Sequence, residues 1–255
     1  MAAKPPAAGR YTTGMTALPS AGAIALQLAG MDLFEGLARE ALLEVAAAGR
    51  LMPLAKGSIL FAQGAPAERC HALVAGRVRI AQAGAEGGQL IVRFVGPGET
   101  FGTVALFTDR RYPAEASAVV DSLEISWPEA TLLELIHRYP PIALNLVRIV
   151  GGRLREVQER LREVATERAE QRIAHALLRL SEQHATPERN DAVIEFPLTR
   201  QDVADMCGVT LYTVSRVLTA WEKAGYIRTD RKQLTIREPA QIRILADGLV
   251  DHPGL

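Results

Sequence analysis

The apolar residues between positions 143 and 164 constrain the fold of this 255-residue chain more than any other feature. They recur at alternating spacings of four and three residues, which is a heptad seam of about three heptads. The pattern predicts a long dimerisation helix over 131–166, whose seam with a second copy consists of Val147, Val150, Leu154, Val157, Leu161 and Val164. Packing of this amphipathic face on the same chain is the alternative interpretation. A second stripe is expected to contact the chain's own preceding domain, through Ile142, Leu146 and Ile149.

Short β-type segments punctuated by glycine precede this helix: "SILFAQG", "CHALVAGRVRIAQ", "QLIVRFVGPGETFG" and "SAVVDSLEISW". Such segments are typical of an antiparallel sandwich or jelly roll. We therefore expect a β-roll sensor domain over 23–130, which includes a helical segment over 34–48. Residues 1–22 are rich in alanine, proline and glycine, a composition that predicts a disordered tail.

The segment "LTRQDVADMCGVTLYTVSRVLTAWEKAGYI" has the features of a helix-turn-helix. Thr199 and Asp202 form a capping-box-like start for a short first helix, and Gly208 suits the turn that ends it. Thr210 caps the second helix, which presents an apolar face of Val214, Val217, Leu218 and Trp221. A hairpin, "GYIRTDRKQLTIRE", follows. We predict a winged helix-turn-helix domain over 167–242 and a tail over 243–255, so that the whole chain is an α+β protein.

The start of the second helix is polar on the face opposite its apolar one, and this is the end that enters the major groove in such domains. We predict base contacts from Leu211, Tyr212, Ser215 and Arg216, since arginine suits a bidentate contact to guanine. Phosphate contacts are expected from hydroxyl, amide and basic side chains: Thr199, Arg200, Gln201, Thr210, Thr213, Arg231 and Lys232. From Thr199 to Arg237 there are seven Lys/Arg against four Asp/Glu, so this segment is mildly basic. A structural helical hairpin is the alternative interpretation.

Overall composition excludes other classes of protein. The formal net charge is zero, so any nucleic-acid signal has to be local. The two cysteines, Cys70 and Cys207, exclude a disulfide scaffold and a four-cysteine metal site. No apolar run has the length of a bilayer span, and the N-terminus lacks a signal-peptide pattern. A cytoplasmic protein without membrane partners is expected.

On these motifs the chain resembles the CRP/FNR family of bacterial transcription factors over nearly all residues after position 30. "LTRQDVADMCGVTLYTVSRVL" and "GPGETFGTVALF" carry the resemblance, and "TLYTVSR" is most similar to the nitrogen-oxide-responsive (NnrR/DNR-like) branch. The resemblance implies a homodimeric regulator, in most cases an activator, that binds an inverted repeat in double-stranded DNA. It also implies contact with RNA polymerase, for which the "FTDRRYPAEA" loop is a candidate surface.

The positions of the family's effector pocket depart from the members that bind cyclic AMP. Those members carry a glutamate for the ribose and an arginine for the phosphate, whereas the matching positions here are Gly102-Thr103 and Pro113-Ala114. We expect these four residues and Val104 to line an effector pocket that does not bind cyclic AMP, unless Arg110 or Arg111 reaches inward. The oxygen-sensing members of the family hold an iron–sulfur cluster with N-terminal cysteines. This chain has no cysteine before Cys70, so an iron–sulfur cluster is not expected.

The signal is therefore left open by the sequence. Haem with nitric oxide is one candidate, with Cys70 and His71 as weak candidate ligands that face opposite sides of a strand. A regulatory module that acts through protein contacts instead of DNA is an alternative function. A cupin-type enzyme is disfavoured because the roll lacks the histidine and glutamate ligand set, and no enzymatic activity is expected.

At Tyr212 the resemblance also breaks down, because well-known members carry a glutamate that accepts a hydrogen bond from cytosine. Tyrosine offers a hydroxyl and an apolar ring instead. The outer "TTG"-like bases of the half-site are thus expected to be kept through Ser215 and Arg216, with relaxed selection at the inner position.

Overall fold

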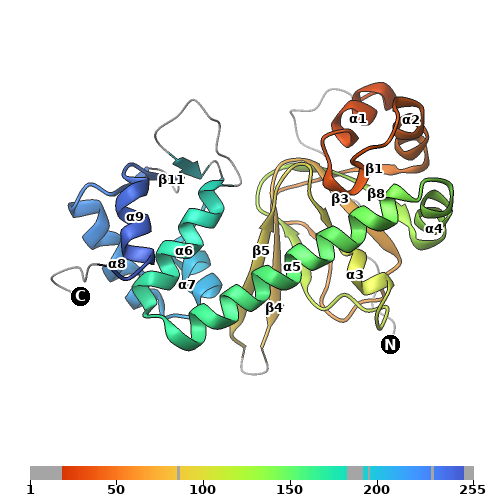
Figure 1. The fold of residues 1–255 in the computed structure, drawn as a ribbon. Coiled ribbons are helices and arrows are strands. Elements are labelled where there is room, and N and C mark those ends of the chain that lie inside the picture. The colour runs from red at the N-terminus through yellow and green to blue at the C-terminus, as the bar shows by residue number, and fades with distance from the viewer. Residues whose placement is uncertain (1–18, 85–86, 183–191, 195, 231–232, 250–255) are drawn as a thin grey trace.

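The computed structural model describes residues 19–84, 87–182, 192–194, 196–230 and 233–249. Two bodies are joined by one long helix, which runs along the N-terminal β domain and leads into the C-terminal helical domain (Figure 1). The predicted tail over 1–22 falls mostly outside the described residues. A helix nevertheless begins at Ala21, within the segment that was predicted to be disordered.

The N-terminal domain is a β-roll made of two antiparallel four-stranded sheets, as predicted. The first sheet has the order β1 (Arg50–Leu54), β8 (Ser122–Pro128), β3 (Arg69–Ala75) and β6 (Thr100–Phe101). The second has the order β2 (Ile59–Phe61), β7 (Glu115–Ala118), β4 (Val78–Ala83) and β5 (Gln89–Val95). A short helix, α3 (Thr103–Leu106), follows β6. Gly102 before it has φ 73°, which suits glycine, and an added Cβ would lie 3.1 Å from the His71 and Tyr112 rings.

Helices cover one end of the roll (Figure 1). They are α1 (Ala21–Leu28), the 3-10 turn η1 (Asp32–Phe34), α2 (Arg39–Ala48) and α4 (Glu129–Arg138). Phe34 packs edge-on against Trp127 of β8 with 5.3 Å between ring centroids. This packing buries the outer face of the first sheet, so β3 is enclosed on both faces and reads as a nearly continuous apolar run.

The predicted single helix over 131–166 is two helices, α4 and α5 (Pro141–Thr166). Pro140 and Pro141 separate them, because neither residue has an N–H to continue the helix and Pro141 occupies the first turn of α5. The second stripe packs on the roll as expected, with Ile142 buried and Leu146 and Ile149 partly buried.

Within the described residues, the C-terminal domain after α5 contains four helices and a small sheet. The helices are α6 (Ala169–Glu182), α7 (Arg200–Cys207), α8 (Leu211–Lys223) and α9 (Pro239–Ala246). Its antiparallel sheet has the order β10 (Ile227–Asp230), β11 (Gln233–Ile236) and β9 (Ala192–Ile194). Helix α9 extends four residues beyond the predicted domain end at 242. Trp221 of α8 is fully buried and its indole N–H donates to Glu170 of α6 at 2.9 Å.

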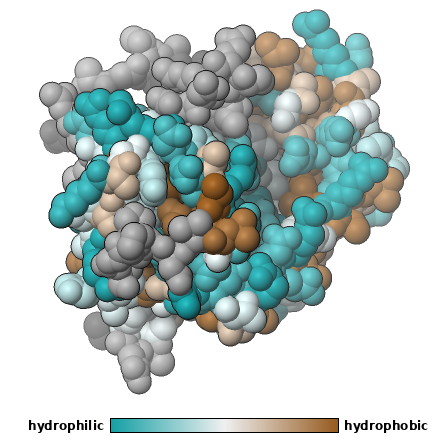
Figure 2. Space-filling model, turned by 60° about the vertical axis from the view of Figure 1, so that its left-hand side comes forward, coloured by the Kyte–Doolittle hydropathy of each residue, from teal (hydrophilic) through white to brown (hydrophobic). Residues whose placement is uncertain are grey.

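The C-terminal domain packs on the second sheet of the roll in the same chain. The rings of Phe94 (β5) and Phe196 lie 4.7 Å apart, and the guanidinium of Arg77 lies 4.7 Å above the Phe196 ring. Ala81 and Ile91 join the same apolar cluster. The molecular surface in Figure 2 is mostly hydrophilic, with its hydrophobic side chains in small separate groups.

Candidate nucleic-acid interface and effector pocket

The helix-turn-helix forms from local capping interactions. The Thr199 hydroxyl accepts from the Asp202 backbone N–H at 3.0 Å, while the Asp202 carboxylate accepts from the Thr199 N–H at 2.8 Å. Gly208 ends α7 in the left-handed region with φ 61°, and Thr210 then caps α8 by accepting from the Thr213 N–H at 3.2 Å. The predicted capping box, turn and second cap are thereby confirmed.

Helix α8 has one buried and one exposed face. Val214, Val217, Leu218 and Trp221 fill the domain core, as the pattern predicted. The four predicted base-contact residues lie at the helix start and on its outward side, with Tyr212 77% exposed, Leu211 and Arg216 exposed, and Ser215 half-buried. A DNA major groove would therefore meet a surface with one guanidinium and one phenol ring projecting from it.

The residues predicted to contact phosphates differ in whether their side chains already make hydrogen bonds within the protein. Arg200 donates to the Ser215 carbonyl at 3.3 Å and to the Thr219 hydroxyl at 3.2 Å, so its guanidinium ties α7 to α8 in this structure. Thr210 and Thr213 share a hydrogen bond at 2.9 Å and are exposed or half-buried. Thr199 caps α7, and Gln201 donates to Asp205. Arg231 and Lys232 lie outside the described residues.

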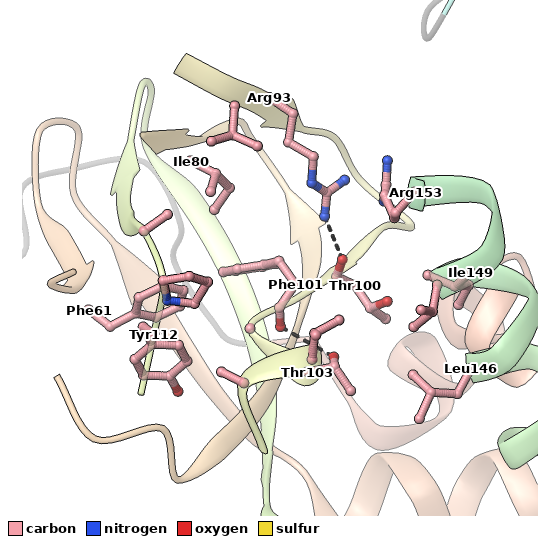
Figure 3. A pocket seen from close by; sticks show the side chains of 17 residues that line it. Phe61, Ile80, Arg93, Thr100, Phe101, Thr103, Tyr112, Leu146, Ile149 and Arg153 are labelled. Carbon is pink, nitrogen blue, oxygen red and sulfur yellow. Dashed lines mark hydrogen bonds between the residues drawn. The ribbon is translucent and has the colours of Figure 1, made fainter. Parts of the chain in front are cut away.

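A cavity of about 230 Å³ lies between the roll and α5 (Figure 3). All five residues predicted to form the effector pocket line it: Gly102, Thr103, Val104, Pro113 and Ala114. Figure 3 shows Phe61 and Tyr112 at one end, Leu146 and Ile149 on the α5 side, and Arg93 and Arg153 at the other end. Arg110 and Arg111 do not reach inward, because Arg110 pairs with Glu129 at 2.7 Å and Arg111 donates to the Gly64 carbonyl at 2.8 Å.

The two arginines of the cavity were missed by the sequence analysis. Arg93 (β5) and Arg153 (α5) both contact Oε1 of Glu99, at 3.0 and 2.8 Å, while Oε2 of Glu99 accepts from the Gly96 N–H at 2.6 Å. Burial, helped by the nearby Arg153 charge, lowers the pKa of Arg93 to about 10 despite the attraction of Glu99. Burial by itself would raise the pKa of Glu99, but the two guanidinium charges outweigh burial and leave that pKa below its usual value. No pattern in the sequence brings positions 93, 99 and 153 together.

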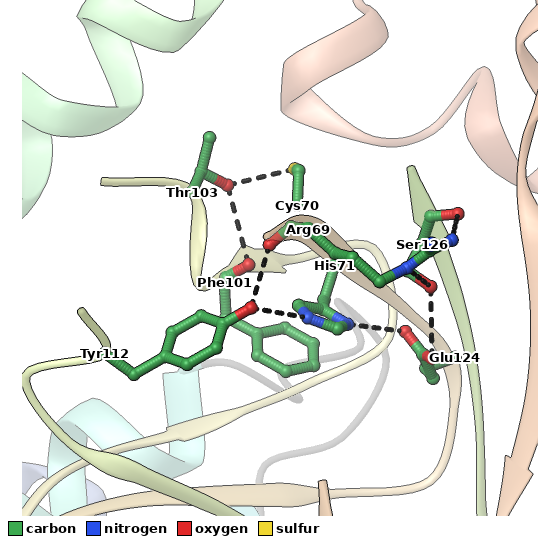
Figure 4. A network of polar contacts seen from close by, with 8 residues as sticks. All are labelled: Arg69, Cys70, His71, Phe101, Thr103, Tyr112, Glu124 and Ser126. Carbon is green, nitrogen blue, oxygen red and sulfur yellow. Dashed lines mark hydrogen bonds and ion pairs between the residues drawn. The ribbon is translucent and has the colours of Figure 1, made fainter. Parts of the chain in front are cut away.

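A second polar network fills the interior of the roll beside this cavity (Figure 4). His71 contacts Glu124 through Nδ1 at 2.9 Å and the Tyr112 hydroxyl through Nε2 at 3.2 Å, and both His71 and Glu124 are buried. Cys70 extends to the opposite side of β3, as expected, and its thiol lies 3.0 Å from the Thr103 hydroxyl. Burial raises the pKa of the Cys70 thiol to about 12, so the thiolate form that ligates metals is strongly disfavoured.

These residues do not fit haem. The side chains that line the cavity include no histidine and no cysteine, and both ring nitrogens of His71 already have protein partners. Among the described residues there is also no group of three His, Cys, Asp or Glu side chains placed to hold a metal ion. A haem site at Cys70 or His71 would require this network to open.

Comparison with known proteins agrees with both domains. The chain matches the cyclic nucleotide-binding domain over residues 51–139 and the Crp-like helix-turn-helix domain over residues 171–245. It is 33% identical to the cyclic AMP receptor protein of Thermus thermophilus over 86% of this chain and 99% of that protein. The chain belongs to the CRP/FNR family of transcription regulators.

Two further proteins match over most of this chain. The transcriptional activator protein Anr of Pseudomonas protegens is 27% identical over 83% of this chain and 86% of its own length. The structure of FixK2 from Bradyrhizobium japonicum superposes with a TM-score of 0.69 at 24% identity, covering 77% of this chain and 96% of FixK2. The relatives are transcription regulators, not enzymes, so this CRP/FNR member is a DNA-binding regulator under the control of its cyclic nucleotide-binding-like domain.

No described helix of this CRP/FNR protein combines the length and apolar character needed to cross a membrane.

Proposed function

We propose that this regulator acts as a homodimer that binds an inverted repeat in double-stranded DNA and activates transcription by contacting RNA polymerase. The main support for a dimer is the apolar character of the outward face of α5. Its six seam residues are all large apolar side chains with 40–69% of their surface exposed. The opposite stripe of the same helix is packed on the roll, so the seam has no described partner within its own chain.

A parallel pair of α5 helices would bury this seam by knobs-into-holes packing. The pairing would also place two C-terminal domains at equivalent positions around a two-fold axis. Two equivalent recognition helices fit two half-sites about one helical turn apart, which is the reason to expect an inverted repeat. The "FTDRRYPAEA" loop carries the half-exposed Phe107 and remains the candidate surface for RNA polymerase.

Control by the roll follows from the position of Val150, which belongs to the seam and also lines the cavity. An effector in the cavity would contact α5 directly and favour one arrangement of the helix pair over another. The nitrogen-oxide-responsive branch remains a prediction. Cyclic AMP is disfavoured because the lining residues at the family's ribose and phosphate positions carry neither a carboxylate nor a guanidinium.

Binding-site selection with the purified protein, followed by fluorescence anisotropy on the selected duplex, tests this function. Arg216→Ala should weaken binding by about 1–3 kcal/mol and relax base preference at one position of each half-site. Lys223→Ala is the matched control, because Lys223 is exposed at the far end of the same helix. Unaltered affinity and preference in Arg216→Ala would contradict the assignment of α8 as the DNA-reading helix.

The protein-contact alternative predicts a different result in the same experiment. A regulatory module that acts only on other proteins would select no duplex sequence at all, in either the wild type or the variants. The exposed, capped start of α8 favours the DNA-binding function.

A further inference from the structure

The walls of the cavity differ sharply in chemical character. One end is formed by the aromatic side chains of Phe61 and Tyr112, and the apolar side chains of Leu146 and Ile149 line the α5 side. The other end carries the guanidinium groups of Arg93 and Arg153. The lining includes two arginines and no acidic residue, so the charged side chains that line the cavity are guanidinium groups at one end only, and their carboxylate partners lie outside the lining.

Glu99 compensates only part of this charge. It contacts both arginines through the same oxygen, and it lies on the wall of a separate polar cleft that also includes Asp32, Glu35 and Glu156. Glu156 pairs with Arg153 at 3.3 Å, but its side chain is 43% exposed, so water screens that pair. Arg93 is the more buried of the two arginines, with 12% of its side chain exposed. Both terminal nitrogens of Arg93 have partners, Glu99 at 3.0 Å and the Thr100 carbonyl at 2.7 Å, so an anion in the cavity would bind by displacing Glu99 from the arginine pair.

Two of the three hydroxyl groups of the lining are already engaged. Thr103 is paired with the Cys70 thiol, and the Tyr112 hydroxyl lies between His71 Nε2 and the Arg69 carbonyl, at 3.2 Å from each. A ligand with many polar groups would therefore lose hydrogen bonds to water without replacing them. The volume of about 230 Å³ is also below the range of roughly 300–1,000 Å³ that is typical of drug-sized ligands.

We propose that the effector is a compact, mainly apolar or aromatic molecule with one carboxylate, which Arg93 and Arg153 bind at the polar end of the cavity. This inference rests on the proposed function, since it names the ligand class of the same regulatory site. The bound carboxylate would compete with Glu99 for Arg153. Because Arg153 lies one turn after Val150 on α5, this competition acts on the helix that carries the dimer seam.

Isothermal titration calorimetry on the full-length protein tests the ligand class. The probes are 4-methylbenzoate, phenylacetate and 3-phenylpropionate, each compared with its neutral primary amide, and cyclic AMP is a further arm. At least one carboxylate should bind about tenfold or more tightly than its amide, because a hydrogen bond to a charged group is stronger than one to a neutral group. Equal binding of every acid and amide, or no binding by any carboxylate, would overturn the proposal, as would tighter binding of cyclic AMP.

Variants locate the site. Arg153→Gln should weaken carboxylate binding about tenfold without changing amide binding, and Arg153→Lys should give an intermediate result because it keeps the charge but loses the planar fork. Leu146→Trp places a larger side chain in the apolar part of the cavity and should abolish the binding of both the carboxylates and the amides. The matched control is Arg148→Gln, because Arg148 is exposed on the same helix and pairs with Asn145 away from the cavity. If the Arg153→Gln and Arg93→Gln variants are folded and bind the carboxylate as tightly as the wild type, the assignment of these two arginines as the binding site is wrong.

DNA binding, measured separately without probe, distinguishes the two proposals. A wild-type protein that binds the carboxylate but no duplex would contradict the proposed function and leave the ligand class standing. A protein that selects an inverted repeat but does not distinguish acids from amides would contradict only the ligand class.

Discussion

Arg79 of strand β4 lies 3.5 Å from Asp202, the carboxylate that caps the first helix of the helix-turn-helix. One oxygen of Asp202 faces the arginine and the other accepts from the Thr199 backbone N–H. The Arg79 side chain thus connects strand β4 of the sensor domain to the start of α7. Phe94 and Phe196 belong to the apolar part of the contact between the two domains.

Removal of the Arg79 charge should loosen α7 without unfolding the protein. The pair is partly exposed, so Arg79→Gln is expected to cost about 0–1 kcal/mol of global stability in urea unfolding. Amide hydrogen exchange should become faster in α7 and β4, because these segments lose their shared ion pair. Arg228→Gln is the control, since Arg228 faces Asp230 across an exposed 3.9 Å gap within the wing. Unchanged exchange in α7 would show that the apolar contact alone docks the domain.

Glu99 should make stability depend on pH. Its folded pKa lies below the unfolded value of 4.5, so its ionised form stabilises the fold above that pH. The contribution is lost as the pH falls below 4.5 and through the folded pKa. The difference in unfolding free energy between wild type and Glu99→Gln should therefore be larger at about pH 7 than at about pH 3. Glu159→Gln, at an exposed position of α5, is the control; a pH-independent difference for Glu99→Gln would contradict the prediction.

Neither native cysteine should react in the folded protein. Burial raises the pKa of Cys70 and of Cys207 to about 12, so both remain neutral thiols at physiological pH. Ellman's reagent should label no thiol in the native state and two in urea. An exposed thiol introduced by Lys223→Cys should react at once and serves as the positive control. Rapid labelling of the wild type would contradict the burial of at least one of these two thiols.

Tyr212→Glu should change the base preference of the DNA site at a single position. The tyrosine is 77% exposed at the start of α8, so a glutamate there would project in the same direction without disturbing the core. A carboxylate accepts a hydrogen bond from the cytosine amino group, and a C·G pair should become preferred by about 1–3 kcal/mol. Binding-site selection measures this preference. If the selected sites stay the same, Tyr212 contacts no base and only fills the groove wall.

Leu154→Lys should separate the proposed dimer. Leu154 is 58% exposed in the middle of the seam, where a charge would have to be buried against the second helix. Sedimentation equilibrium should show a shift towards monomer and anisotropy should show weaker DNA binding. Leu26→Lys provides the comparison, because Leu26 is a similarly exposed leucine on α1, far from the seam in sequence. A dimer that is equally stable in both variants would rule out the α5 seam.

The local elements of this protein were predictable because they depend on short-range patterns. The capping box of Thr199 and Asp202 and the turn at Gly208 each involve residues within a few positions of one another. The strands follow from β-type runs between glycines, and the buried face of α8 follows from its helical period. The predicted helix over 131–166 is divided in the structure, because Pro140 and Pro141 separate α4 from α5, whereas the heptad pattern over 143–164 lies wholly on α5.

The amino-acid sequence by itself determined the two domain types, the long apolar seam, the polar start of α8 and the absence of the family's ribose and phosphate side chains. Only the tertiary structure brought Arg93 and Arg153 to the cavity, tied Arg200 to α8 and paired Arg79 with Asp202. The physical reason is the range of the interactions. Helix caps and periodic faces are set by neighbours along the chain, whereas the charges around a cavity depend on which distant strand and helix the hydrophobic core brings together.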